Sequence, residues 1–236
     1  MSTKEKFRTY ENVFDNSTLR TLFKLSSQGY FDELKSPISV GKESNVFSAS
    51  KGKDSVIVKI YRVNACDFKR MYNYIAGDPR FKDIQKQRRK VIDTWARREF
   101  SNLLTARKAG ARVPAAHAVS SNVLVMEFIG NNKETAPKLK DKTPQDLKKF
   151  SENIILSLKK MYTYKLVHGD LSEYNILNYQ EKPVLIDLSH TLTLQHPNAQ
   201  ELLKRDIQTL VHYFTKKGLS LSTEGVLKKI KHGIHL

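Results

Sequence analysis

Apolar and polar residues follow different spacings in the two halves of the chain, and the first half has the patterns of strands. The segments SPISVGKESNVFSAS and KDSVIVKIYRV predict two strands, and KGKD, where they meet, is typical of a hairpin turn. Before them, residues 17–26, STLRTLFKLS, predict a short helix that begins at a Ser or Thr cap. After them, AGDPRF indicates a loop.

A long helix and a further strand follow this loop. The stretch from about Lys86 to Ala109 repeats apolar residues at helical spacing, and AGARVP ends it. SNVLVMEFIG then has the continuous apolar run of a buried strand. The apolar positions of the predicted helix include Val91, Trp95, Phe100, Leu103 and Leu104.

The second half of the chain has mainly helical spacing. After the polar link NNKETAPKLKDKTP, apolar residues recur at helical positions from Leu147 to Tyr162, a stripe that core packing explains. A short strand, PVLIDL, precedes helices over about 198–217 and 222–230. We therefore expect an α+β protein with a strand-rich and a helical lobe. The expected parts are an N-terminal helical extension (1–35), an N-terminal lobe (36–128), a hinge and linker (129–144) and a C-terminal lobe (145–236).

Composition narrows the class of protein. Of the 236 residues, 39% are hydrophobic and 28% are charged, as in soluble globular proteins. No apolar run approaches the ~20 residues of a transmembrane helix, and MSTKEKFRTYENVF lacks the apolar core of a signal peptide. The single cysteine, Cys66, permits no intrachain disulfide, which suits a reducing compartment. We expect a cytoplasmic protein without a membrane partner.

The net charge of +17 favours a polyanionic partner. The stretch from Arg80 to Phe100 is strongly basic, and further lysines lie near the C-terminus. A solvated basic surface would also explain these residues. We favour a partner such as a nucleic acid or a ribosomal surface, in addition to a nucleotide. The C-terminal lysines are Lys216, Lys217, Lys228, Lys229 and Lys231.

The segment LVHGDLSEYNIL, Leu166 to Leu177, concentrates polar side chains between apolar flanks. It contains Asp170 and Asn175, and a second acid, Asp187, follows the apolar run VLI. This set suits phosphoryl transfer from a magnesium nucleotide, in which one carboxylate accepts the proton of the attacking group. The Asn oxygen and the other carboxylate would hold Mg²⁺, which prefers oxygen ligands. We assign Asp170 as the base, and Asn175 and Asp187 as metal ligands.

Phosphoryl transfer also requires a cation on the phosphates, and Lys59 in VIVKIYR is the best candidate. It lies in a predicted buried strand, where an inward-pointing lysine needs a partner. Glu99, in the helix that follows, is a plausible one. Two alternatives remain open: Lys59 on the solvent face of its strand, and Glu99 in a surface pair with Arg97 or Arg98.

The remaining nucleotide contacts are predicted from two segments. SVGKESNVF has a single glycine and matches neither the P-loop nor the glycine-rich loop of ordinary protein kinases, so its backbone amides, Lys42 and Ser44 would contact phosphate. Met126 to Gly130, MEFIG, lies where a hinge between lobes would bind adenine through its backbone. The residues assigned to ATP are Gly41, Lys42, Ser44, Val46, Lys59, Glu99, Met126, Glu127 and Ile129.

Seven segments together resemble the RIO family of atypical protein kinases, over about Phe23 to Gly218. HGDLSEYNIL is most similar to the type 1 subgroup, and the residues before SVGKE are too few for the winged-helix domain of type 2. In this family the matching residues have the roles assigned above, and Asp206 would bond the catalytic-loop backbone. The segments are GKESNVF, VIVKIYR, TWARREF, VMEFIG, HGDLSEYNIL, LIDLSH and HPNAQELLKRD.

The resemblance implies an ATP- and Mg²⁺-dependent serine/threonine kinase or ATPase with a two-lobed protein-kinase-like fold. Its helical C-lobe would be truncated, without activation segment or peptide-docking helices, because IDLS replaces DFG, APE is missing and 49 residues follow Asp187. Expected partners are ATP, a small ribosomal subunit precursor or rRNA, and a protein substrate, with the kinase itself among the candidates. The family is associated with maturation of that subunit.

Two alternatives stay open. Aminoglycoside and choline kinases also carry an HGD…N loop followed by an ID strand, so a small-molecule phosphotransferase fits the loop taken alone. A nucleotide-gated RNA or pre-ribosome factor fits the basic segments. His168 is interpreted as an orienting or packing residue, and His196 and Arg205 match the family's stretch after the metal loop. The seven histidines show no zinc-ligand spacing with cysteines, so we predict no zinc.

Overall fold

The computed structural model describes residues 14–64, 66–81, 86–131 and 134–232. They form two compact units. Within these ranges, the first unit contains the residues up to 76, those from 81 to 100 and 115–128, and the second contains 77–80, 101–114 and the residues from 129 onward. Of the helices within the described ranges, none combines the length and apolarity needed to cross a membrane.

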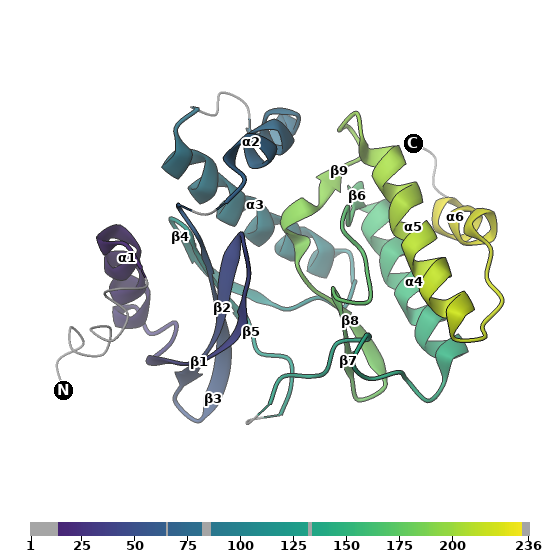
Figure 1. The fold of residues 1–236 in the computed structure, drawn as a ribbon, viewed down its shortest axis with the longest axis horizontal. Helices are drawn as coiled ribbons and strands as arrows, with labels where there is room; N and C mark the ends of the chain where they lie inside the picture. Colours follow the sequence, from purple (N-terminus) through teal and green to yellow (C-terminus); the bar gives the residue numbers. More distant parts are fainter. Residues whose placement is uncertain (1–13, 65, 82–85, 132–133, 233–236) are drawn as a thin grey trace. The chain divides into compact units, whose positions relative to one another are not determined.

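The first unit is built on a five-stranded antiparallel sheet in the order β1-β2-β3-β5-β4 (Figure 1). The predicted hairpin is confirmed: β2 and β3 pair along their whole length, and Lys51 lies opposite Asp54 across the turn. Gly52 in this turn has a φ of 58°, a conformation that favours glycine. The strands are β1 (Glu33–Val40), β2 (Ser44–Lys51), β3 (Asp54–Tyr61), β4 (Ala116–Ser120) and β5 (Val123–Glu127).

One strand prediction was wrong in detail, and one strand was not predicted. SPISVGKESNVFSAS is not one strand but the end of β1 and most of β2, separated at Gly41–Glu43. The Gly41 N–H donates to the Ser44 carbonyl at 2.9 Å, which turns the chain back on itself. The short β4, AHAVS, was not predicted, because its five residues show no clear alternation of apolar and polar side chains.

Helix α1 (Asn16–Ser27) packs on this sheet and was predicted, but its cap is different. The N-cap is Asp15, whose carboxylate accepts the N–H groups of Ser17 and Thr18. A Ser or Thr cap was expected, yet both of these residues lie inside the first turn. The apolar face of α1 joins the core that covers one side of the sheet; its members include Leu22, Leu25, Phe31, Phe47, Val56, Val58 and Ile60.

The first unit also contains α2 (Phe68–Ala76) and most of α3 (Arg88–Lys108). The long helix α3 is confirmed, and its residues up to Phe100 belong to the first unit. Helix α2 was not predicted, and Pro79–Phe81 in the expected loop form a short 3₁₀ helix. Met71, Ile75 and Trp95 share a core in which each is at most 1% exposed.

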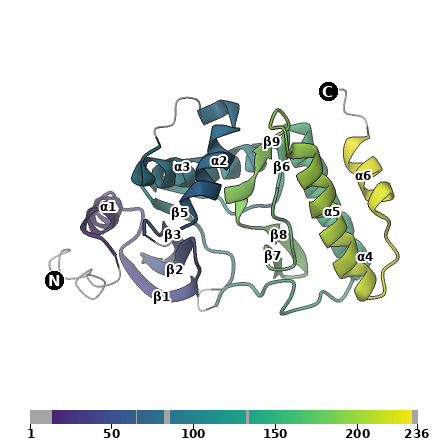
Figure 2. The same ribbon diagram turned by 45° about the horizontal axis from the view of Figure 1, so that its top comes forward.

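The second unit is mainly helical, and its predicted helices are confirmed. Helices α4 (Leu147–Thr163), α5 (Ala199–Lys216) and α6 (Thr223–Lys231) lie side by side in both ribbon views (Figures 1 and 2). Two small sheets accompany them, and the predicted strand PVLIDL ends earlier than expected, at Leu185. The strand pairs are β6 (Leu166–Val167) with β9 (Leu192–Thr193), and β7 (Ile176–Tyr179) with β8 (Lys182–Leu185).

Candidate active site

Lys59 and Glu99 form a buried ion pair in the first unit. Lys59 Nζ lies 3.0 Å from each Glu99 carboxylate oxygen. Lys59 is 4% exposed and Glu99 is 0% exposed. The structure therefore brings the two predicted partners together, and the alternative of a solvent-facing Lys59 is wrong.

The alternation of side chains along β3 explains why Lys59 points toward α3. Val56, Val58 and Ile60 belong to the core shared with α1. Because successive residues of a strand face opposite sides, Lys59 and Tyr61 face the other way, where Glu99 lies on α3. Arg98 does not draw Glu99 to the surface; its guanidinium stacks over the Trp95 ring at 5.0 Å and is itself buried.

Tyr61 is a third member of this cluster and was missed by sequence reasoning. Its hydroxyl donates a short hydrogen bond to Glu99 Oε2. Lys59 Nζ also lies 5.2 Å from the centre of the Tyr61 ring. The signal in the sequence was the two-residue spacing in VIVKIYR, which places Tyr61 on the same face of the strand as Lys59.

The predicted phosphate loop is the tight turn between β1 and β2. A Cβ at Gly41 would lie 3.2 Å from the Ser44 carbonyl oxygen, so a larger residue would crowd the turn. Lys42 is exposed and Ser44 is half-buried. Val46 lies directly opposite Lys59 in the β2–β3 pairing. The loop is thus anchored to the strand that carries the lysine.

The predicted hinge residues fall at the end of the first unit and the start of the second. Met126 and Glu127 end β5 and are half-buried, and Ile129 is 4% exposed. The Glu127 N–H donates to the Ala115 carbonyl at 2.8 Å, and the Ile129 carbonyl accepts the Ala136 N–H at 2.8 Å. The Glu127 N–H and the Ile129 carbonyl are therefore bonded within the protein, and the predicted adenine contacts would involve the backbone groups that lie between them in the chain.

In the second unit, Asp170 and Asn175 contact each other within one loop. The Asn175 amide nitrogen donates to the Asp170 carbonyl at 2.8 Å and to the Asp170 carboxylate at 3.1 Å. Both side chains are half-buried. Because the amide nitrogen faces Asp170, the amide oxygen is the Asn175 atom suited to a cation.

Gly169 and Asp206 fix the backbone of this loop. Gly169 has a φ of 79°, and a Cβ there would lie 2.5 Å from the His190 carbonyl oxygen, so glycine is required. The Asp206 carboxylate accepts the N–H groups of Gly169 at 2.7 Å and Leu171 at 3.0 Å. Arg205 donates to the Gly169 carbonyl at 2.6 Å. The predicted structural role of Asp206 is confirmed.

Two opposing effects act on the protonation of Asp206. Its burial raises the pKa of the carboxyl above the ordinary value of 3.8. The charge of His168, the two backbone N–H donors and Arg205 act in the lowering direction. His168 is 1% exposed, and its Nε2 lies 3.2 Å from the Ile186 carbonyl oxygen, as expected of an orienting residue.

Asp187 has an unusual backbone conformation. Its φ of 59° and ψ of 66° lie in the left-handed region, which is uncommon for residues other than glycine, Asn and Asp. The Ser189 hydroxyl donates to its carboxylate at 2.8 Å. The Ile186 N–H donates to the Asn175 carbonyl at 3.0 Å, so the segments of both predicted metal ligands are joined directly. Such strain is typical of functional positions.

A polar network that sequence reasoning missed holds the segment after Asp187. The Asn102 amide nitrogen donates to the carbonyls of Leu188 at 2.8 Å and Thr191 at 3.1 Å. Arg80 donates to Asn102 Oδ1 at 2.8 Å and pairs with Asp78 at 2.6 Å. No local motif predicts these contacts, because Asn102 and Leu188 are 86 residues apart.

The same contacts correct the interpretation of the basic segment. Arg80 is bonded within the second unit, and Arg98 is buried among aromatic rings of the first. Arg88, Lys90 and Arg97 are exposed. Part of the segment lies outside the described residues, at 82–85. Some basic residues of this segment are therefore bonded inside the protein, and others are exposed on its surface.

The predicted metal ligands have the chemistry of a magnesium site. Asn175 and Asp187 supply an amide and a carboxylate oxygen, both half-buried. Mg²⁺ is usually held by one or two carboxylates together with waters and substrate phosphates. Over the described ranges there is no group of three or more His, Cys, Asp or Glu side chains that could hold a metal by themselves. The residues thus fit Mg²⁺ that arrives with a nucleotide.

A sheet unit with a buried Lys–Glu pair and a helical unit with an Asp–Asn loop define the protein-kinase-like class. The crystal structure of the Rio2 kinase–ADP/Mg²⁺–phosphoaspartate complex from Chaetomium thermophilum has a TM-score of 0.67 to this chain at 20% identity, covering 89% of this chain and 65% of that one. A second Rio2 kinase structure from the same organism has a TM-score of 0.68 at 20% identity, covering 90% and 67%. The fold is α+β, two-lobed and protein-kinase-like. Within the described residues 188–232, helices α5 and α6 follow Asp187.

The family follows from sequence similarity. Residues 45–226 match the model of the RIO domain. The RIO-type serine/threonine-protein kinase Rio1 of Haloferax volcanii is 41% identical over 91% of this chain and 74% of its own length. Its namesake from Methanocaldococcus jannaschii is 43% identical over 96% of this chain and 78% of its own length. The chain belongs to the RIO domain family, and it is a phosphotransferase.

Proposed function

We propose that the protein is an ATP- and Mg²⁺-dependent serine/threonine kinase and ATPase of the type 1 RIO subgroup, which also phosphorylates itself. Two hydrogen bonds of Asn175 carry the proposal. Its side-chain amide donates to the Asp170 carboxylate, and its backbone carbonyl accepts the N–H of Ile186, the residue before Asp187. These bonds gather a candidate base and two candidate magnesium ligands. The names of the archaeal relatives support the proposal, as does the similar Rio2 structure, which is a complex with ADP and Mg²⁺.

Each site residue has a proposed role in this chemistry. Lys59, oriented by Glu99, would bind the α- and β-phosphates. Asp170 would accept the proton of the attacking hydroxyl or water, and Asn175 and Asp187 would hold Mg²⁺. Bound Mg²⁺ would neutralise charge on the phosphates.

The remaining proposed ATP contacts, and the proposed parts of the chain, follow the same scheme. Gly41, Lys42, Ser44 and Val46 would cover the phosphates, and Met126, Glu127 and Ile129 would bind adenine. We propose an N-terminal extension (1–35), an N-lobe (36–128), a hinge and linker (129–144) and a C-lobe (145–236).

A purified sample with Mg²⁺-ATP tests the proposal. We expect nucleotide binding, ATP hydrolysis and transfer of the γ-phosphate to the protein itself. The absence of all three would reject the function. An acceptor screen with amino-alcohols, aminoglycosides and sugars tests the competing small-molecule activity, and rapid transfer to any of these would favour that alternative.

We further propose that the protein acts in the cytoplasm on maturing small ribosomal subunits, where ATP turnover drives its release. The family resemblance motivates this setting, and the net charge of +17 is compatible with it. Pull-down with Asp170→Ala should retain more immature subunits than wild type does. Equal recovery by both proteins would contradict coupling between turnover and release.

An RNA-binding role can coexist with turnover and has its own support in the surface. Arg88, Lys90 and Arg97 on α3 are exposed, as are Lys228, Lys229 and Lys231 on α6. Binding through phosphate contacts should weaken steeply as salt rises. If subunit association is independent of salt and survives Arg88→Ala with Lys90→Ala and Lys228→Ala with Lys229→Ala, the surfaces have no such role.

A further inference from the structure

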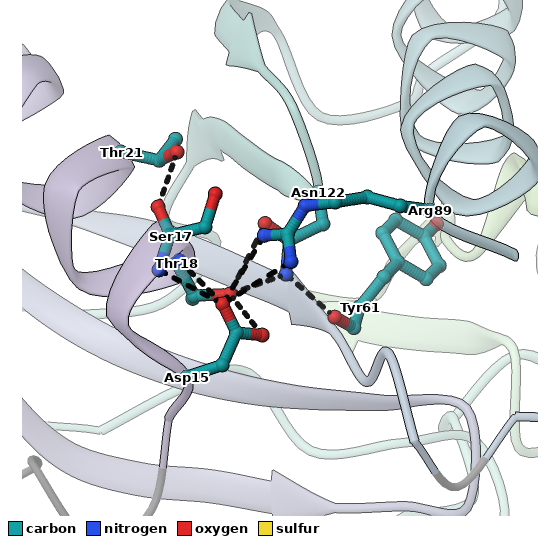
Figure 3. Close-up of polar contacts among 7 residues, drawn as sticks. All are labelled: Asp15, Ser17, Thr18, Thr21, Tyr61, Arg89 and Asn122. Atoms are coloured by element: carbon teal, nitrogen blue, oxygen red, sulfur yellow. Dashed lines mark hydrogen bonds and ion pairs between the residues drawn. The ribbon is translucent and has the colours of Figure 1, made fainter.

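A continuous series of hydrogen bonds in the first unit connects helix α1 with the Lys59–Glu99 pair. It begins at Thr18 on α1, passes through Asn122 in the turn before β5, and reaches Tyr61 at the end of β3 (Figure 3). The Tyr61 hydroxyl then bonds Glu99. The function of Tyr61, Asn122 and Thr18 is not explained by the roles proposed so far.

Asn122 clamps the backbone of Tyr61 from the turn. The Tyr61 N–H donates to the Asn122 carbonyl at 2.9 Å, and the Asn122 amide nitrogen donates to the Tyr61 carbonyl at 2.8 Å. The same amide nitrogen donates to the Thr18 hydroxyl oxygen at 3.0 Å. Asn122 is 1% exposed and Thr18 is 2% exposed, so these bonds are shielded from water and their loss is not readily compensated.

Helix α1 is also bonded to α3, which carries Glu99. Arg89 on α3 donates to the Asp15 carboxylate at 3.2 Å, and Asp15 caps α1 (Figure 3). Helix α1 therefore contacts both elements of the ion pair: β3 through Asn122, and α3 through Arg89. A shift of α1 would therefore move the elements that carry Lys59 and Glu99.

Tyr61 touches both members of the ion pair. Its hydroxyl donates to Glu99, and its ring lies against the Lys59 ammonium group. A buried carboxylate and ammonium are well oriented only when further hydrogen bonds satisfy the carboxylate. A tyrosine whose peptide is clamped on both sides can supply such a bond from a fixed place.

We propose that Tyr61 is a positioning residue for the Lys59–Glu99 pair, and that α1, through Thr18 and Asn122, holds Tyr61 in place. Tyr61 directs the Glu99 carboxylate, which in turn directs the Lys59 ammonium group at the phosphates of ATP. This inference rests on the proposed function, because it assumes that Lys59 binds phosphate.

Tyr61→Phe tests the first part, since it removes the hydroxyl and keeps the ring. We expect kcat/KM for ATP to fall about tenfold, as for loss of one hydrogen bond to a charged group. The Kd of ATP should rise, whereas the Kd of adenosine, which has no phosphates, should not change. A purely structural role would weaken both ligands alike. Tyr72→Phe is the matched control, because Tyr72 stacks on Phe68 in the same unit, and it should behave as wild type.

Thr18→Val tests the second part, since it removes the hydroxyl from α1 at nearly constant volume. We expect about a threefold fall in kcat/KM for ATP, no change for adenosine, and recovery with Thr18→Ser, which restores the hydroxyl. This pair also tests the inference if Tyr61→Phe does not fold.

The outcomes separate the inference from the function beneath it. If wild type neither binds nor turns over ATP, the proposed function fails. If wild type is active and Tyr61→Phe retains its kcat/KM and its Kd for ATP within twofold, the positioning role is wrong. If Tyr61→Phe shows the loss but Thr18→Val does not, the link to α1 is wrong.

Discussion

The two units contain their candidate catalytic groups in opposite environments. In the first unit, Lys59 and Glu99 are buried and neutralise each other. In the second, Asp170, Asn175 and Asp187 are half-buried, and the residues that hold their segments lie behind them: Asp206 bonds the loop backbone, and Asn102 bonds the chain after Asp187.

This difference shows two ways in which a fold can hold a candidate catalytic side chain. Lys59 and Glu99 stabilise the fold as well as having a proposed role in catalysis, because removal of either leaves a buried charge without its partner. In the second unit these two roles belong to different residues: the proposed catalytic side chains Asp170 and Asp187 are half-buried, and the buried Asp206 and Asn102 bond the backbone. Mutations of the candidate catalytic residues should therefore separate stability from activity in the second unit but not in the first.

The largest stability effect is expected for Glu99→Ala, which should destabilise the protein by about 3–5 kcal/mol because Lys59 stays buried without its carboxylate. Urea unfolding followed by circular dichroism measures this loss. Asp170→Ala, a half-exposed group, should cost less than about 1 kcal/mol. Similar losses for the two variants would remove the distinction between the units.

Asp187→Asn should raise the Mg²⁺ concentration at half-maximal ATP turnover about tenfold or more, because the site loses a charged ligand. Stability should be almost unchanged, since Asn also tolerates the left-handed conformation found at Asp187. A Mg²⁺ titration of ATP turnover gives the first value and urea unfolding the second. An unchanged Mg²⁺ dependence would show that Asp187 is not a ligand.

Asp206→Asn should destabilise the protein by about 1–3 kcal/mol and lower ATP turnover as well, although Asp206 is placed behind the loop. An asparagine has one acceptor oxygen for the two N–H groups of Gly169 and Leu171. Unfolding and turnover are measured on the same preparation. Glu201→Gln, an exposed change on the same helix, is the control and should alter neither quantity.

The smallest effect concerns the cap of α1. Burial raises the pKa of Asp15, but the Thr18 N–H and Arg89 outweigh it and hold that pKa below the ordinary 3.8. The ionised cap therefore contributes stability above pH 3.8, which is lost as pH falls through the lowered pKa. Asp15→Ala should cost about 1 kcal/mol at neutral pH, and Asp15→Asn a few tenths.

Urea unfolding of wild type and Asp15→Asn at neutral pH and at a pH below the lowered pKa of Asp15 checks the sign of this effect. The small difference between the two proteins should disappear in acid, because both side chains are then uncharged. A difference that grows as pH falls would contradict the assigned role of the charge.

Sequence patterns predicted the helices and strands in which apolar residues recur regularly over many neighbouring positions. Helices α3, α4 and α5 each carry a sustained apolar stripe, and the Lys59 strand is continuous and apolar. Helix α2 also has apolar residues at helical spacing, Phe68, Met71 and Ile75, but it is only nine residues long, and β4 is only five. The Asp15 cap was missed because Ser17 and Thr18, which also favour caps, follow it within three residues.

The catalytic candidates were predictable for a different reason than their supports. Asp170, Asn175 and Lys59 belong to motifs in which residue type and spacing express chemistry. Asn102 acts through a contact with a residue 86 positions away, which only the fold reveals. The strand spacing puts Tyr61 on the same face as Lys59, but its bond to Glu99, 38 positions away, also comes from the fold. The count of basic residues also overestimated the charge on the surface, because Arg80 bonds Asp78 and Arg98 is buried.

ATP turnover by Asp170→Ala tests the central claim most directly. Asp141→Ala is the matched control, because Asp141 is an exposed acid of the same unit that pairs with Lys140. With Mg²⁺ and saturating ATP, we predict a turnover roughly 10²–10⁴-fold below wild type for Asp170→Ala and an unchanged rate for Asp141→Ala. A folded Asp170→Ala protein with the wild-type rate would contradict the assignment of Asp170 as the base.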